Sequence, residues 1–245
     1  YESMKFIGKQ FVKNTVGFLY YHSYKKFKEK GNRALIYHAF GSILPHDTYG
    51  ISIKKDSFIN HIDYLRDNYS FTKISNDHDN KLTISITIDD GYKDTLDAID
   101  YITKYKIPFS LYITTNTIGR KDYLNEDDLR NISSLDYCEL GTHGHTHSKL
   151  GKLTYEAQKE ELQSSMECLE DIIQKKVHCL SYPHGSYNID TIDNAKKIGY
   201  LNASTSNKGF NSDFTNKYEK NRIEVICNDT IDDLVKKING FYDYY

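Results

Sequence analysis

Strand-like and helix-like segments alternate along most of the 245 residues, and this alternation restricts the fold more than any other feature of the sequence. Short apolar or β-branched stretches predict seven strands, at 35–38, 83–88, 109–114, 137–141, 178–182, 201–204 and 223–226. Longer stretches predict six helices, at 55–68, 92–105, 127–134, 155–175, 189–198 and 230–239. Such alternation is typical of a parallel sheet. We therefore expect an α/β protein, a single-domain distorted (β/α) barrel with about seven parallel strands and its active site at their C-terminal ends.

The composition fits one soluble catalytic domain and excludes several other classes. A chain of 245 residues with 38% hydrophobic content can form one sizeable core. The net charge of −2 argues against a nucleic-acid binder that works by neutralising phosphates. The four cysteines are scattered without a C-x-x-C pair, so neither a zinc knuckle nor a disulfide framework is indicated.

The strand predicted at 83–88 stops at two adjacent carboxylates and a glycine, Asp89-Asp90-Gly91. Adjacent aspartates repel each other, and aspartate is a poor strand former. A bound cation would stabilise the pair. Asp-Asp-Gly is also ordinary turn chemistry, so this segment alone leaves both a turn and a cation site open.

A second cluster, Gly141 to His147, holds three of the ten histidines within five residues. His143 and His147 are four residues apart, so one helical turn would place both imidazoles on the same face. His145 has the wrong phase to join them. Two histidines and one carboxylate suit Zn²⁺ or another divalent transition metal and leave room for water and substrate. The alternative is a run of surface histidines.

A third segment, Ser181 to Tyr187, follows a short apolar run and contains Pro183 and Gly185. Proline fixes the backbone, and glycine loosens it two residues later. A loop of this kind can present main-chain N–H groups to a substrate oxygen. A plain turn explains the segment equally well.

In this order, the three segments resemble the motifs of the polysaccharide deacetylase family, the NodB-like carbohydrate esterases. The matches to T-F-D-D-G, H-S/T-x-x-H and R-x-P-Y lie at 87–91, 143–147 and 181–184. The departures are Ile88 for phenylalanine, Gly144 for serine or threonine, Ser181 for arginine and His184 for tyrosine. The resemblance spans about residues 33–226 and is nearest to members that act on bacterial cell-surface glycans.

The resemblance implies N-deacetylation of an N-acetylated glycan by a metal-dependent hydrolase. Asp90, His143 and His147 would hold the divalent metal, with Zn²⁺ as the expected ion. Asp89 would be the general base, and Arg222 would orient it.

The proton donor is the point at which the sequence departs most from the family. A late histidine commonly protonates the leaving amine, but no histidine follows His184 here. His184 or His38 would have to substitute, since a histidine titrates near neutral pH. The main-chain N–H of His184 would also stabilise the oxyanion.

The N-terminal residues 1–32 are predicted to be a basic amphipathic extension before a catalytic domain at 33–245. Tyr1-Glu2-Ser3 precede Met4 and are expected to be an expression remnant. Residues 4–30 carry seven lysines among apolar residues, which favours either a helix packed across the barrel or a helix at a membrane surface. Without a signal peptide or a long apolar stretch, the expected location is the cytoplasm, including the inner face of the membrane.

Two rival functions remain on the sequence alone. One is a glycan-binding homologue that kept the metal site but lost turnover, which the missing late histidine favours. The other is a hydrolase of a small amide or ester on the same barrel.

Overall fold

The computed structural model describes residues 15–16, 30–45, 47–76 and 81–244. Most of the predicted basic segment at 4–30 lies outside the described residues, so its structure, the division at residue 32 and its membrane association stay predictions. Among the described helices, none combines the length and the apolarity needed to cross a bilayer.

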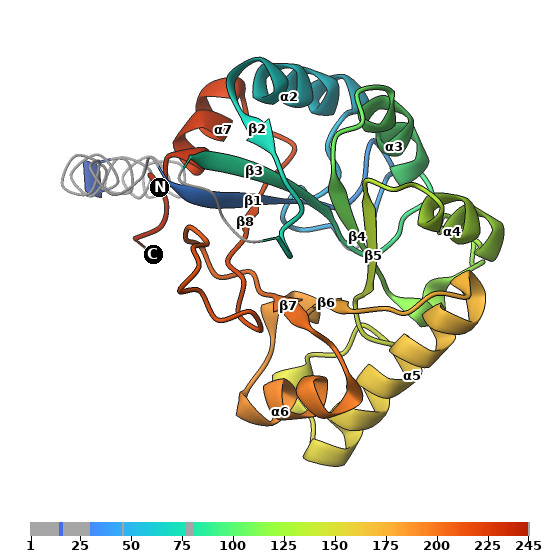
Figure 1. Ribbon diagram of the computed structural model, residues 1–245. Coiled ribbons are helices and arrows are strands. Elements are labelled where there is room, and N and C mark those ends of the chain that lie inside the picture. Colours follow the sequence, from blue (N-terminus) through green and yellow to red (C-terminus); the bar gives the residue numbers. More distant parts are fainter. Residues whose placement is uncertain (1–14, 17–29, 46, 77–80, 245) are drawn as a thin grey trace, which may run out of the picture.

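The core of the fold is a curved sheet of parallel strands, as the alternation predicted (Figure 1). Its spatial order is β7-β6-β5-β4-β3-β1-β8. These strands are β1 (Gly31–Tyr37), β3 (Leu82–Ile88), β4 (Phe109–Ile113), β5 (Cys138–Thr142), β6 (Cys179–Ser181), β7 (Asn202–Ser204) and β8 (Ile223–Glu224). A short strand that the sequence did not predict, β2 (Ser70–Phe71), pairs with β3. The predicted fold class is confirmed.

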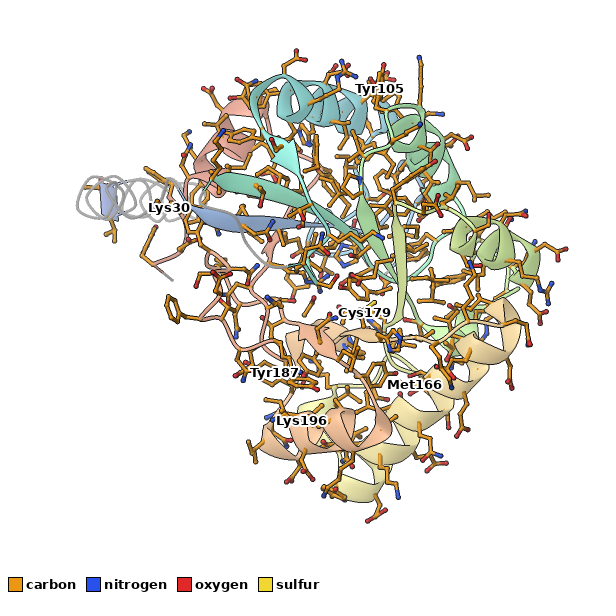
Figure 2. The ribbon with its side chains drawn as sticks, in the orientation of Figure 1. Lys30, Tyr105, Met166, Cys179, Tyr187 and Lys196 are labelled. Atoms are coloured by element: carbon orange, nitrogen blue, oxygen red, sulfur yellow. The ribbon has the colours of Figure 1, made fainter. Side chains whose placement is uncertain are left out.

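The helices cover the outer side of the curved sheet (Figure 1). They are α2 (Lys55–Asn68), α3 (Thr95–Lys104), α4 (Glu126–Ser133), α5 (Tyr155–Ile173), α6 (Ile189–Ile198) and α7 (Ile231–Ile238), with short 3₁₀ turns η2 (Thr115–Thr117), η3 (Leu150–Lys152) and η4 (Pro183–Gly185). Side chains fill the space between the sheet and α5, where Met166 and Cys179 are both buried (Figure 2). The burial explains why an apolar stripe recurs along each helix.

The central strand β3 is buried on both faces, one of them apolar and the other polar. Ile84 and Ile86 belong to the hydrophobic core, whereas Ser85 and Thr87 alternate with them and are also fully buried. Both hydroxyls are hydrogen-bonded: Ser85 Oγ donates to Thr72 O, and Thr87 Oγ1 donates to Leu35 O. The inside of the barrel is therefore polar, as a site for chemistry requires.

The two end strands of the sheet are joined by the segment 205–222. Ser204 and Lys220 form an isolated parallel bridge, and Asn211 exchanges two main-chain hydrogen bonds with Asn32 of β1. This segment crosses the space between β7 and β8 and delivers Arg222 to the inside of the barrel.

Candidate active site

A cavity of about 520 Å³ lies at the C-terminal ends of the strands and is lined by residues far apart in the sequence. Asp89 and Asp90 follow β3, His143 follows β5, and His38 follows β1. His147, Lys149, Tyr182, His184 and Glu224 also line it. All three segments singled out in the sequence thus meet at one place.

Asp90, His143 and His147 converge closely enough to share one ion. Their potential ligand atoms all lie within 4.8 Å of one another. Nε2 of His147 is 3.2 Å from Oδ1 of Asp90, and Nε2 of His143 is 3.5 Å from the same oxygen. Two atoms that each bond zinc at roughly 2.0–2.1 Å are at most about 4 Å apart. Both separations from Oδ1 of Asp90 fit that limit.

The hydrogen bonds around these residues also fit a metal ion. Oδ1 of Asp90 is buried and, among the described residues, accepts no well-oriented hydrogen bond, although Nε2 of His147 lies 3.2 Å away. A buried carboxylate oxygen without a directed donor is costly, so this position suits a cation. Nδ1 of His143 lies 2.9 Å from the carbonyl oxygen of Ser181. Because a carbonyl only accepts, Nδ1 donates, and the lone pair of Nε2 faces Asp90.

The surroundings hold two of the three candidate ligands, His143 and Asp90, in the protonation state that binds a metal. Burial lowers the pKa of His143 to about 4 despite the neighbouring aspartates, so its imidazole is neutral at pH 7. Burial by itself would raise the pKa of Asp90, but His147 and His38 outweigh burial and hold it below its ordinary value. His147 differs, because its contact with Asp90 overcomes burial and raises its pKa. A proton and a metal ion would compete for its Nε2.

The expectation that a helical turn brings His143 and His147 together is wrong. Residues 143–149 belong to no helix or strand. The chain leaves β5 at Thr142 and turns sharply, with left-handed backbone at Gly144 (φ 70°) and His147 (φ 64°). The two rings nevertheless meet, with centroids 5.0 Å apart. The loop, rather than a helix, sets their geometry.

Backbone strain is concentrated in this site. Six described residues other than glycine have positive φ, and three of them line the cavity: Asp90 (73°), His147 (64°) and His184 (57°). Such backbone is unfavourable for residues with a Cβ and persists only where the surroundings enforce it. Its clustering here marks the cavity as functional.

Asp89 is held beside this cluster by a buried ion pair. Arg222 donates from Nη1 to Oδ1 and from Nη2 to Oδ2 of Asp89, both at 2.8 Å, and both side chains are buried. Burial alone would raise the pKa of Asp89, but the charge of Arg222 outweighs it and holds the pKa below its ordinary value. Oδ2 lies 3.8 Å from Nε2 of His143. Asp89 is therefore an ionised carboxylate fixed next to the candidate metal ligands.

Ser181 is a site residue that the sequence reasoning treated only as a departure from a motif. Its Oγ donates to Oδ2 of Asp89 at 3.1 Å and accepts from Nη2 of Arg222 at 2.6 Å. Where the resemblance leads one to expect arginine, a small hydroxyl leaves room for Arg222 to approach from the other end of the sheet. Its position at the end of a predicted strand was the only available signal.

Two histidines remain as candidate proton donors, and they differ in their surroundings. The ring of His184 lies 4.4 Å from the ring of His147, and burial, assisted by that neighbour, lowers the pKa of His184. Nδ1 of His38 lies 3.7 Å from Oε1 of Glu224, a contact the sequence did not reveal. Both imidazoles line the cavity.

Comparisons by sequence give consistent matches. A family model described as polysaccharide deacetylase matches residues 76–203, about half of the chain. The Bacillus subtilis protein YxkH, named for the same family, is 27% identical over 201 residues, which are 78% of this chain and 70% of YxkH. A poly-beta-1,6-N-acetyl-D-glucosamine N-deacetylase of Staphylococcus aureus is 26% identical over 159 residues, 60% of this chain. The match spans 54% of that enzyme.

Comparisons by structure support the fold. BA0330 from Bacillus anthracis has a TM-score of 0.75 at 24% identity, covering 86% of this chain and 69% of its own. The Streptococcus pyogenes deacetylase PplD, solved with acetate, has a TM-score of 0.74 at 22% identity, covering 86% of this chain and 99% of its own. Both structures are less than 25% identical to this chain, so these matches support the fold alone.

Proposed function

Because this chain belongs to the polysaccharide deacetylase family, we propose that it is a metal-dependent de-N-acetylase. Its substrate in this proposal is an N-acetylated sugar of a bacterial surface glycan or of the lipid-linked precursor of such a glycan. The observation that carries the proposal is the convergence of Asp90, His143 and His147 beside a carboxylate, Asp89, fixed by Arg222.

Asp90, His143 and His147 would hold the ion, with Zn²⁺ as the expected species because two imidazoles and one carboxylate suit it. When bound, such an ion lowers the pKa of water toward roughly 7 and polarises the acetyl oxygen.

In this mechanism Asp89 takes the proton from the attacking water. The water oxygen adds to the acetyl carbon, the C–N bond breaks, and the nitrogen gains a proton, which yields acetate and a free amine. A general base must be unprotonated and well oriented. The low pKa of Asp89 keeps it ionised, and its bonds to Arg222 and Ser181 fix the direction of its free lone pairs.

The leaving amine needs a proton donor, and we favour His38 over His184. The pKa of His184 is lowered, so its imidazole is largely uncharged at neutral pH. The ring of His38 lines the cavity and faces the carboxylate of Glu224, which can hold its orientation. We assign His184 to substrate contact, through its main-chain N–H at the oxyanion.

One lining residue of the cavity favours a glycan over a small amide or ester, whereas the volume fits either substrate. The volume of the cavity, about 520 Å³, lies within the range typical of ligand sites. Tyr49 lines it with 78% of its surface exposed, as expected for an aromatic platform beneath a sugar. The staphylococcal relative suggests a polymer of N-acetylglucosamine as the first substrate to test.

The decisive experiment measures acetate release from N-acetylated oligosaccharides, with and without a chelator, alongside metal analysis of the protein. The proposal requires activity that the chelator abolishes and Zn²⁺ restores. His143→Ala should lose most of both metal and activity. A folded, metal-loaded wild-type protein that releases no acetate would instead support the glycan-binding alternative.

A further inference from the structure

The position of His147 needs an explanation, because no regular element holds it. Gly144 to Thr146 form an irregular loop, and His147 itself has left-handed backbone. Without support from outside, a loop of this kind would sample many arrangements. Proteins that place a functional group on a loop usually fix it by contacts from a rigid element.

The main-chain carbonyls of the loop are fixed by η2. The N–H of Thr115 donates to the carbonyl of Gly144 at 3.3 Å, and the N–H of Asn116 donates to the carbonyl of His145 at 3.0 Å. These two carbonyl groups of the loop therefore have hydrogen-bond donors. The N–H groups of His145 and Thr146 are bonded to a different element.

Those N–H groups converge on one carboxylate, that of Glu161 in α5. Oε2 of Glu161 accepts from the N–H of His145 at 3.0 Å and from the N–H of Thr146 at 2.9 Å. Oε1 accepts from Oγ1 of Thr146 at 2.5 Å. A Cβ at position 144 would lie 3.4 Å from Oε2, so the loop packs directly against the carboxylate. Three charge-assisted hydrogen bonds from one side chain make a strong anchor.

We propose that Glu161 is a positioning residue that holds the 144–146 loop so that Nε2 of His147 reaches Asp90. The residue lies 14 positions beyond His147, on a 19-residue helix packed against the barrel. It does not touch the ligand atoms; it acts through the loop backbone. This inference rests on the proposed function, since the geometry it preserves is that of the metal ligands. Outer partners of metal ligands typically contribute about 10- to 100-fold in metal affinity.

The test compares Zn²⁺ affinity, measured by competition with a chromophoric chelator, in the full chain and three variants. Glu161→Ala removes all three hydrogen bonds and should weaken Zn²⁺ binding by about 10- to 100-fold. Glu161→Gln keeps an acceptor for both main-chain N–H groups and should retain most of the affinity. Glu160→Ala alters an exposed neighbour on the same helix and should bind as the wild type does.

Thermal unfolding of the metal-free variants separates positioning from general stability. Metal-free Glu161→Ala should melt close to the wild type and regain acetate release at saturating Zn²⁺, whereas a merely destabilised protein would melt at a lower temperature without metal. If that variant does not fold, Glu161→Asp, whose carboxylate is one methylene shorter, takes its place with the same expectation. Wild-type affinity in either variant overturns the inference while leaving the proposed function intact. A wild-type protein that binds no Zn²⁺ removes both.

Discussion

Asp89 and His147 face the same cavity but are held in opposite ways. The side chain of Asp89 is 3% exposed, and both its oxygens are fixed by side chains inside the barrel. The side chain of His147 is 34% exposed. Its position is set through the backbone, by a loop that is anchored on the outer helix α5. The proposed base thus depends on a buried ion pair, and the proposed metal ligand on an external anchor. Substitutions at these two residues should therefore impair the protein in different ways.

The largest expected effect is the loss of activity in Asp89→Asn. The amide keeps the shape of the carboxylate but cannot take a proton from water. Acetate release should fall by about 10²- to 10⁴-fold, the usual contribution of a general base. Metal content, measured on the same purified sample, should stay at the wild-type level. A variant that lost its metal would show that Asp89 is itself a ligand. The contrast between Asp89 as base and His147 as ligand would then be wrong.

His147→Ala should produce a similar loss of activity by the other route. Removal of a ligand should weaken Zn²⁺ binding by more than the roughly 10- to 100-fold known for outer partners. The melting temperature of the metal-free protein should change little, because His147 is partly exposed and packs on a loop. A large fall in that temperature would mean that the loop contributes to the core after all.

Arg222→Met should mainly destabilise the fold. It leaves Asp89 as an uncompensated buried charge, for which about 3–5 kcal/mol of unfolding free energy is the usual loss. Arg130→Met is the matched control, since Arg130 pairs with Glu126 and Asp127 on the exposed surface of α4 and should cost less than about 1 kcal/mol. Denaturant unfolding of both variants measures the difference. Equal losses of unfolding free energy would show that the buried pair contributes no more to stability than the exposed one.

Much of the fold could be predicted from the sequence because it follows from local patterns. The isoleucines of β3 and the apolar stripes of the helices need only the periods of strand and helix. Thr154 directly precedes the helix predicted at 155–175, and its side chain accepts from the N–H of Ala157, as an N-cap threonine does. The two-residue strand β2 was missed because so short a segment carries no period.

The site could be predicted only where its residues stand together in the sequence. Asp89-Asp90 and the histidine cluster can be recognised as short motifs. Helical spacing, however, is not what brings His143 and His147 together. Ser181 contacts Asp89 across 92 positions of sequence, and Glu161 looks like any polar helix residue. Contacts of this kind are set by the curvature of the sheet and by loop conformation, which local patterns do not encode.

The pH dependence of stability should separate the two histidines by sign. The folded pKa of His143, about 4, lies below the ordinary value near 6.5, so the unfolded chain binds the extra proton between these values. His143 therefore favours the folded state above about pH 6.5 and loses that contribution toward pH 4, by at most about 1.4 kcal/mol per unit. The raised pKa of His147 acts oppositely: its contribution is present below its unfolded pKa and lost as pH rises through the folded one.

Unfolding of metal-free protein in a chelator, at several pH values, tests this difference. His143→Gln should flatten the loss of stability on acidification, and His147→Gln should steepen it. If stability depended on pH in the same way in both variants, the buried His143 and the loop-held His147 would have the same environment. The difference between them would then be wrong.

The smallest expected effect concerns Tyr49, at the rim of the cavity. Asp47 accepts hydrogen bonds from the N–H groups of residues 49–52, so the loop presents this exposed ring in a fixed place. Tyr49→Ala should lower kcat/KM on an oligosaccharide by about 2- to 12-fold, as the loss of one aromatic contact implies. Phe214→Ala, which removes an aromatic ring that is 99% exposed and does not line this cavity, is the control.

The chain length of the substrate decides how the Tyr49 result is understood. If the ring supports a sugar next to the acetylated one, the loss should appear with oligosaccharides and vanish with a single N-acetylated sugar. An equal loss with both would place the ring against the reacting sugar. No loss with either would favour a small substrate bound entirely among Asp89, His147 and their neighbours, and the glycan assignment would then have to be abandoned even though the metal chemistry survived.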